Sequence, residues 1–372
     1  MFLAIREMRR AMARFGLLMA SVGLLVFLIL FQQTLQNGLI TSFVGAIENQ
    51  SAPVLVYSVD GRRNLQGSVI TPPLEQAIRS AEGVGRAGRI GQGTFSVDTS
   101  DGLTSAAIIG YEQEGLGSPS TLTEGRLPTA DNEAVSLDTS TNGFAIGDKV
   151  VVEPGGLEIT IVGRASKIGY QASPTLFTTY ATYEAAVKAA NPDATGALPA
   201  VIAVEPAAGT TDAQLVTNVN DSSPDADALT RADAAAKTPG VAQIQQSFQI
   251  IFLLYGLVIP LVTGLFFLII TLQKANALTL LRAIGAPGSA LVRSLLVQVT
   301  IVLVVGIGIG IALYTPLASQ RLGDIPLSFQ TGAVVFWSVL LLVLGILSSL
   351  FSARRVLRID PIEATTGGGV EL

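Results

Sequence analysis

The chain has 372 residues, of which 49% are hydrophobic and only 14% charged, and its net charge is -5. That composition is too apolar for an ordinary soluble protein of this size. Cysteine and histidine are both absent, which excludes disulfides, thiolate sites and histidine-based catalytic triads, so we expect no catalytic residues and no metal site.

A basic arm precedes the first apolar segment. Ile5, Met8, Met12 and Phe15 fall on one helical face, whereas the other face carries arginines, with Arg9 at the boundary. The arginines of that other face are Arg6, Arg10 and Arg14. This pattern favours an amphipathic helix over residues 1–14 at the cytoplasmic membrane surface. The alternative is that the arginines only fix the membrane topology.

Four apolar segments are each long enough to cross a hydrocarbon layer about 30 Å thick as a helix of about 20 residues. The first could instead be a cleaved signal peptide, because arginines precede it. We favour an uncleaved anchor, since the mostly polar residues 32–36 follow it without a small-residue cleavage site. The segments cover residues 15–31, 250–272, 295–317 and 333–351.

Basic residues indicate which ends of these segments lie in the cytoplasm. They gather in the amino-terminal arm, in the connection after the second segment and at the start of the tail. By the positive-inside rule, both termini are cytoplasmic in a multi-pass protein. These residues are Arg6, Arg9, Arg10 and Arg14, then Lys274, Arg282 and Arg293, and finally Arg354, Arg355 and Arg358.

The long segment between the first two spans has the alternating pattern of an α+β domain. It begins with strands at 54–57, 95–97 and 106–110 around a helix at 73–82. A β-rich second subdomain is predicted over 122–179, with strands at 134–137, 149–152 and 157–162. Helices at 183–190 and 210–218 and a strand at 200–204 then return to the first unit. Residues 221–237 have the composition of a loop or lid with little packed core.

The spans carry two further features. Gly306 and Gly310 form a small-xxx-small pair that permits close helix approach, either inside one subunit or at a moving contact. Pro260 introduces a candidate hinge. Aromatic and amide residues at the outer ends of the first two spans are either interfacial anchors or the lining of a substrate cleft. The cleft candidates are Phe27, Phe31, Gln32, Gln33, Phe252 and Tyr255.

Motifs for an internal energy source are absent. No G-x-x-x-x-G-K-[ST] sequence occurs, so the chain cannot bind ATP through a P-loop. The apolar cores of the four spans contain no charged residue, which disfavours ion-coupled transport. Any transport therefore needs an external energy source.

Two cytoplasmic segments carry a specific pairing of motifs. The first is Leu281-Arg282-Ala283-Ile284-Gly285-Ala286, and the second is the arginine-rich, Asp-Pro-containing tail at 353–364. Together they resemble the coupling helix and tail of the MacB/FtsX family of ABC permeases. The layout also matches that family, with the four-span type closest to the HrtB/DevC-like exporter branches. One departure is Ala277, where family members often have glutamate.

The resemblance implies a membrane α-helical fold of four transmembrane helices with an α+β extracytoplasmic domain, made of a porter-like lobe and a β-rich second lobe. It implies a homodimer in the bacterial cytoplasmic (inner) membrane, two copies of a cytoplasmic ABC ATPase, membrane lipid around the chain and no nucleic acid. The chain itself has no cofactor, because the partner ATPase binds ATP and Mg. The residues implied in ATPase coupling are Lys274, Leu280, Leu281, Arg282, Ala283, Ile284, Gly285 and Ala286, and those of the tail contact are Arg354, Arg355, Arg358, Asp360 and Pro361.

The expected organisation alternates membrane and aqueous segments. Its parts are an amino-terminal helix (1–14), transmembrane helix 1 (15–36), the extracytoplasmic domain (37–246), transmembrane helix 2 (247–273), a cytoplasmic coupling segment (274–288), transmembrane helix 3 (289–317), a short extracytoplasmic cap (318–331), transmembrane helix 4 (332–352) and a cytoplasmic tail (353–372).

Two functions fit this organisation. The first is ATP-driven movement of the outer domain, called mechanotransmission, that exports or extracts a hydrophobic or amphiphilic substrate. The absence of histidine ranks haem below other lipophiles. The alternative is a substrate-free regulator of an extracytoplasmic partner such as a cell-wall hydrolase. A sensor is disfavoured, because the cytoplasmic segments are too short to hold a signalling domain.

Overall fold

The computed structural model describes residues 8–138, 143–273, 288–318, 320–322 and 325–357. The chain divides into two compact units. The membrane unit contains residues 1–35, 247–320 and 327–372, and the outer unit contains residues 36–246 and 321–326. We describe each unit by itself.

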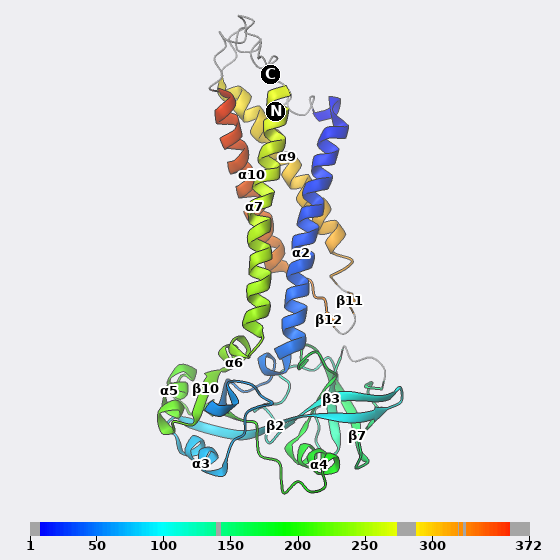
Figure 1. Ribbon diagram of the computed structural model, residues 1–372, viewed down its shortest axis with the longest axis vertical. Coiled ribbons are helices and arrows are strands. Elements are labelled where there is room, and N and C mark those ends of the chain that lie inside the picture. Colours follow the sequence, from blue (N-terminus) through cyan, green and yellow to red (C-terminus); the bar gives the residue numbers. More distant parts are fainter. Residues whose placement is uncertain (1–7, 139–142, 274–287, 319, 323–324, 358–372) are drawn as a thin grey trace, which may run out of the picture. The chain divides into compact units, whose positions relative to one another are not determined.

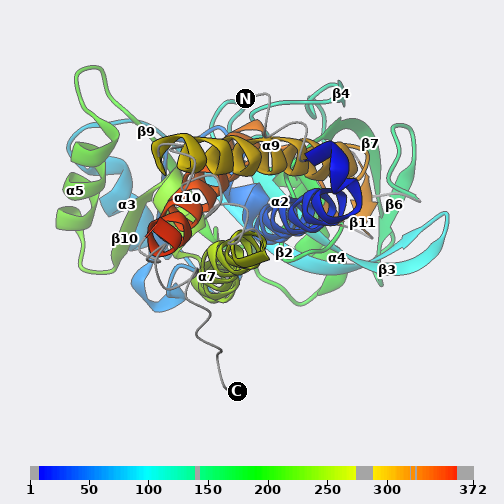
Figure 2. The ribbon, with the colours of Figure 1, turned by 90° about the horizontal axis from the view of Figure 1, so that it is seen from above.

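Four helices of the described chain are long and apolar enough to cross a membrane. Their apolar side chains share one core, in which Ile29, Val299 and Leu303 are fully buried. Figure 2 shows these helices from above, with α10 beside α9. The predicted four spans and the membrane α-helical fold are thus confirmed. The helices are α2 (Met12–Glu48), α7 (Val241–Gln273), α9 (Gly288–Tyr314) and α10 (Thr331–Leu357).

The outer unit is built on one sheet of ten strands, in the order β10-β1-β9-β2-β3-β8-β5-β7-β4, with β6 paired to both β2 and β7. Two pairs, β3 with β8 and β5 with β7, are parallel. The strands are β1 (Val54–Ser58), β2 (Val84–Thr99), β3 (Gly102–Tyr111), β4 (Glu124–Gly125), β5 (Glu133–Leu137), β6 (Lys149–Val152), β7 (Leu157–Ala165), β8 (Thr175–Thr179), β9 (Val201–Pro206) and β10 (Ala226–Thr230). A separate pair, β11 (Arg321–Leu322) with β12 (Ile325–Pro326), is antiparallel.

Helices at the two ends of the sheet define two lobes. Figure 1 shows α3 (Pro72–Ser80) and α5 (Asp212–Ser222) at one end and α4 (Tyr180–Ala190) at the other. Local sequence starts these helices: prolines occupy the first turn of α3, Thr179 caps α4, and Thr211 with Gln214 forms a capping box for α5. The remaining short helices are η1 (Val59–Gly61) and α6 (Arg231–Lys237).

Both faces of the sheet are covered. In β1, Val54 and Val56 belong to the cluster under α3 and α5, whereas Leu55 and Tyr57 belong to the cluster on the opposite face. All five β1 residues are therefore buried, which explains why the strand is a mostly continuous apolar run and not an alternation of apolar and polar residues. The expected α+β domain with a β-rich second lobe is confirmed.

The interpretation of residues 221–237 as a loop or lid is wrong. The segment contains β10, which pairs with β1, followed by α6. Ala226, Ala228 and Ala234 are buried, so alanines rather than large apolar residues form this part of the core. The small side chains hid the strand, because alanine has little strand preference of its own.

Candidate functional site

The predicted coupling and tail residues lie mostly outside the described part of the chain. This holds for Lys274, for residues 280–286, and for Arg358, Asp360 and Pro361. Arg354 and Arg355 belong to α10, but their side chains are not described. Their contacts with an ATPase therefore stay predictions.

The end of α2 is bonded to the loop between β7 and β8, and we call residues 167–172 of this loop the α2 latch. The amide of Ala46 donates to the carbonyl of Gly169 over 2.9 Å. Two latch amides donate to the helix, from Gln171 to Phe43 over 3.0 Å and from Ala172 to Ser42 over 2.9 Å. The latch joins α2 to the β-rich lobe through main-chain atoms.

Two glycines permit this approach. A Cβ at Gly45 would lie 2.3 Å from the Lys167 oxygen, and one at Gly169 would lie 3.0 Å from the Ser42 oxygen. Lys167, with a φ of 59°, occupies the left-handed region that non-glycine residues rarely adopt. Gln171 and Ala172 of the latch do the same, with φ values of 50° and 52°. Such backbone persists only where surrounding contacts hold it, so the bonds to α2 and the shape of the latch depend on one another.

A close crossing joins α2 to α9 in the membrane unit. Cβ atoms at Gly306 and Gly310 would lie 2.7 Å and 2.6 Å from side-chain atoms of Val22 and Val26. Gly23 faces the same crossing, because its Cβ would lie 3.1 Å from the Gly306 oxygen. The predicted glycine pair therefore packs against α2 of the same subunit. Movement at this contact stays a prediction.

A second close contact lies at the proline of α7. Ser348 of α10 donates to the Pro260 carbonyl over 2.7 Å. A Cβ at Gly264 would lie 2.4 Å from the Ser348 oxygen, so the hydroxyl fits only beside a glycine.

Three helices meet at the single tryptophan of the chain. The Trp337 indole nitrogen of α10 donates to the Gln33 oxygen of α2 over 3.4 Å, and its ring lies 5.2 Å from that of Phe252 on α7. Phe27 and Phe31 stack on each other at 6.0 Å along α2. Phe27, Phe252 and Tyr255 pack partly buried against the membrane core, and Gln32 is likewise half-buried. Gln33 and Phe252, two of the six predicted cleft residues, thus meet at Trp337. The sequence analysis did not single out Trp337, although a lone tryptophan in an apolar segment is a visible signal.

An ion-pair network fastens α3 to the sheet of the outer unit. The buried Glu75 accepts from Arg79 at 2.8 Å and from Arg89 at 2.9 Å, and Glu112 also bonds Arg79. Burial alone would raise the pKa of Glu75, but the two guanidinium groups outweigh it and hold that pKa below its ordinary value. A surface hollow of about 460 Å³ opens beside this network.

A second pair lies in the β-rich lobe. Arg126 binds Glu133 through both guanidinium nitrogens, and the amides of Thr129 and Ala130 also donate to that carboxylate. These donors lower the pKa of Glu133 to about 2. Within the described ranges, no group of acidic residues is placed to hold a metal ion.

Known proteins similar to the chain are permeases. "Uncharacterized ABC transporter permease Rv0072" of Mycobacterium tuberculosis (strain H37Rv) is 24% identical over 369 residues, 99% of each chain. "Putative hemin transport system permease protein HrtB" of Staphylococcus haemolyticus is 29% identical over 111 residues, 30% of this chain and 31% of that one. The predicted resemblance to ABC permeases, HrtB among them, is confirmed. No protein-family model matches the chain.

Solved structures give weaker likenesses. The periplasmic region of MacB from Actinobacillus actinomycetemcomitans aligns with 55% of this chain and 95% of its own, at 14% identity and a TM-score of 0.36. The extracellular domain of the Gram-positive transporter YknZ aligns with 48% of this chain and 98% of its own, at 10% identity and a TM-score of 0.33.

Proposed function

From the place of this chain among ABC transporter permeases, we propose that it transmits the work of a separate cytoplasmic ATPase to its outer unit and thereby exports or extracts a hydrophobic or amphiphilic substrate. Two permease copies work with two ATPase copies, which bind ATP and Mg. The protein lies in the bacterial cytoplasmic membrane with both termini in the cytoplasm.

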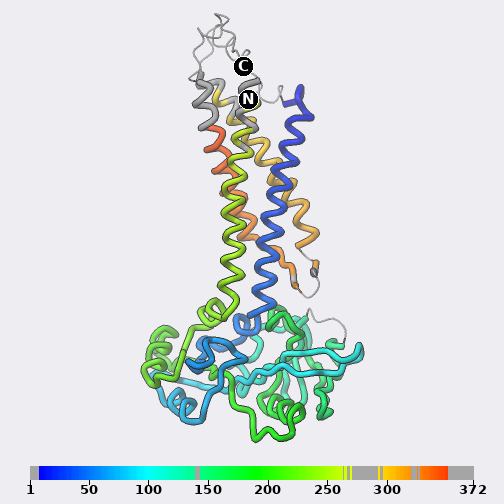
Figure 3. The backbone as a smooth tube through the Cα atoms, viewed as in Figure 1, coloured from blue at the N-terminus to red at the C-terminus, as the bar shows by residue number. Residues whose placement is uncertain are grey.

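The observation that carries the proposal is the path of α2. This helix runs without a break from Met12 to Glu48, and its residues belong to the membrane unit up to Leu35 and to the outer unit from Gln36 (Figure 3). Its last turns are bonded to the β-rich lobe through the α2 latch. A shift of the helix is therefore passed to main-chain atoms of the outer unit rather than to flexible side chains.

The substrate class follows from the membrane unit. A lipophile that reaches the protein from the bilayer needs apolar contacts with a few polar groups, and Phe27, Phe31 and the amides of Gln32 and Gln33 offer that combination near one another along α2. Hemin is named for the HrtB relative. Because this chain has no histidine to ligate haem iron, we rank haem below other lipophiles as its substrate.

The experiment uses the absence of cysteine from the chain. One spin label at Asp101→Cys, an exposed position in the β2–β3 hairpin, reports the distance between two copies in the complex with the ATPase. We expect this distance to change between ATP-bound and nucleotide-free states. Arg282→Glu in the coupling motif should abolish the change, whereas Arg293→Glu, the matched charge reversal outside the motif, should retain it.

Four outcomes would contradict the proposal. Absence of a dipolar signal rules out the dimer, and a distance insensitive to nucleotide rules out mechanotransmission. Unchanged ATPase activity after both Arg282→Glu and Gly285→Pro would rule out the coupling site. Retention of a wall hydrolase by the full-length chain, without altered export of any lipophile in a deletion strain, would favour the regulator.

A further inference from the structure

An apolar pocket of about 290 Å³ lies at the amino-terminal end of α2, against α9. The chain has only four methionines, and Met8, Met12 and Met19 all line this pocket. Phe15, Gly16, Ile301 and one charged residue, Arg9, complete it. Every methionine after the first residue therefore faces one small volume.

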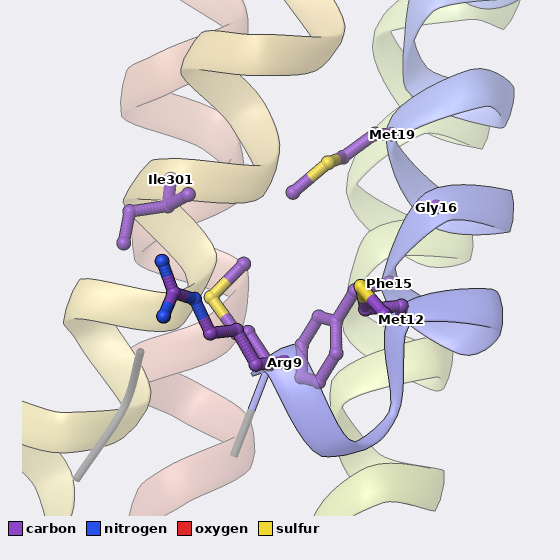
Figure 4. A pocket seen from close by; sticks show the side chains of 7 residues that line it. Arg9, Met12, Phe15, Gly16, Met19 and Ile301 are labelled. Atoms are coloured by element: carbon purple, nitrogen blue, oxygen red, sulfur yellow. The ribbon is translucent and has the colours of Figure 1, made fainter. Parts of the chain in front are cut away.

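A turn in the backbone builds the pocket. The chain turns at Ala11, whose amide donates to the Met8 carbonyl over 3.3 Å, and α2 begins at the next residue. Figure 4 shows Met19 extending from α2 toward α9, where Ile301 lies, with the Arg9 side chain between the two helices. The turn thus brings a basic residue beside an apolar space.

Space remains inside the pocket. A Cβ at Gly16 would meet no atom within 4 Å, and Met12 is 70% exposed although it is large and apolar. Methionine is flexible and polarizable, so proteins use it where an apolar surface must fit ligands of variable shape. At about the lower limit of ligand pockets, this volume suits a single hydrocarbon chain rather than a bulky molecule.

Charge identifies the end group of the ligand. Arg9 lines the pocket, and Arg10 and Arg14 are exposed next to it. The cytoplasmic leaflet is negatively charged, and basic pockets between membrane helices on that side bind anionic headgroups. A zwitterionic lipid would gain little from these arginines, because its net charge is zero.

We propose that this pocket binds an anionic phospholipid of the cytoplasmic leaflet, with one acyl chain among the methionines and the phosphate on Arg9. The site lies where α2 packs against α9, so an occupied pocket stabilises the helix that leads to the α2 latch. The proposal rests on the cytoplasmic placement of the arginine-rich end and is independent of the transported substrate.

The test uses the purified full-length chain in detergent without ATPase, so its failure leaves the transport proposal standing. Native mass spectrometry measures binding of dioleoyl phosphatidylglycerol, with dioleoyl phosphatidylcholine as the comparison lipid. We expect clear preference for the anionic lipid. Arg9→Gln should weaken its binding about fivefold, as expected for one basic residue near a charged surface, whereas Arg10→Gln should have less effect.

A second pair of variants tests the apolar part. Gly16→Leu places a leucine side chain at the pocket, where an added Cβ meets no atom within 4 Å, and should weaken lipid binding on the order of tenfold, comparable to the loss of two buried methylenes. Gly308→Leu on α9, whose Cβ also meets no atom within 4 Å, is the matched control and should bind normally. Fluorescence of Trp337 checks that each variant folds.

Four results would overturn the proposal. Equal affinity for both lipids would exclude headgroup recognition, and equal losses from Arg9→Gln and Arg10→Gln would indicate diffuse attraction instead of a site. Undiminished binding by Gly16→Leu would show that the acyl chain lies elsewhere. Copurification of a neutral lipophile in place of phospholipid would assign the pocket to the transported substrate.

Discussion

Replacing Gly45 with alanine should detach the α2 latch. The added methyl carbon would lie 2.3 Å from the Lys167 oxygen, whereas ordinary contact begins at 3.4 Å, so the loop must withdraw by roughly 1 Å. That displacement breaks the three main-chain hydrogen bonds between the latch and α2. At about 1 kcal/mol for each bond, and with about 1 kcal/mol regained because alanine favours the helix, we expect the outer unit to lose about 2 kcal/mol.

Pulse proteolysis of the full-length chain across a urea series measures this loss as a lower midpoint for cleavage of the outer unit. Gly308→Ala on α9 is the matched control, since the same substitution within a helix meets no atom within 4 Å there. An outer unit that is as stable in Gly45→Ala as in the wild type would refute the reasoning. So would equal destabilisation by the control. In the complex with ATPase, Gly45→Ala should retain ATP hydrolysis but lose most of the nucleotide-dependent movement of the outer unit.

Further predictions concern side-chain contacts. Glu133→Gln should lower the free energy of unfolding of the outer unit at pH 7, as measured by urea unfolding. The difference from wild type should shrink between pH 4.5 and about 2, where the wild-type carboxylate becomes protonated. A difference that stays constant over this range would disprove the ionic contribution. Gly264→Ala should lower the midpoint of thermal unfolding in detergent, and adding Ser348→Ala should restore part of the lost stability. The two substitutions should show a coupling energy of about 0.5–3 kcal/mol, and strictly additive effects would contradict the contact. Gln33→Leu should shift the fluorescence emission of Trp337 to shorter wavelength. It should also lower the stability of the membrane unit by about 0.6 kcal/mol, the average for a hydrogen bond between membrane helices. An unchanged emission spectrum would mean that the indole has another partner.

Hydropathy predicted the four spans because about 20 consecutive apolar residues have few alternatives to a membrane helix. It did not predict how far the helices continue. α2 extends through the polar residues after its apolar window to Glu48, and Gln36 and Ser42 in that extension are buried. Their burial depends on tertiary contacts, which no local window contains.

Strands rich in branched residues were predicted close to their observed limits, as for β6 and β7. The α2 latch could not be predicted, because its main-chain bonds join residues 42–46 to residues 169–172, which are far apart in the sequence. In the sequence, only Gly45 and Gly169 hint at the α2 latch, and a glycine alone does not indicate a close helix contact because it also occurs in many turns and loops. Trp337 was visible as the single tryptophan, but its partners come from two other helices.

The pairing of β1 with β10 limits how the outer unit can fold during export. Val54 opposite Thr230 joins the first strand of the ten-stranded sheet to the last one in chain order, and β9, on the other side of β1, also comes late in the sheet's sequence. Ribosome and translocon must therefore deliver almost the whole unit before β1 acquires either neighbour. Until then β1 is an apolar strand with two unpaired edges outside the membrane, where it can pair with other chains. We therefore expect the outer unit to be most prone to aggregation while it emerges from the translocon, before β9 and β10 have paired with β1.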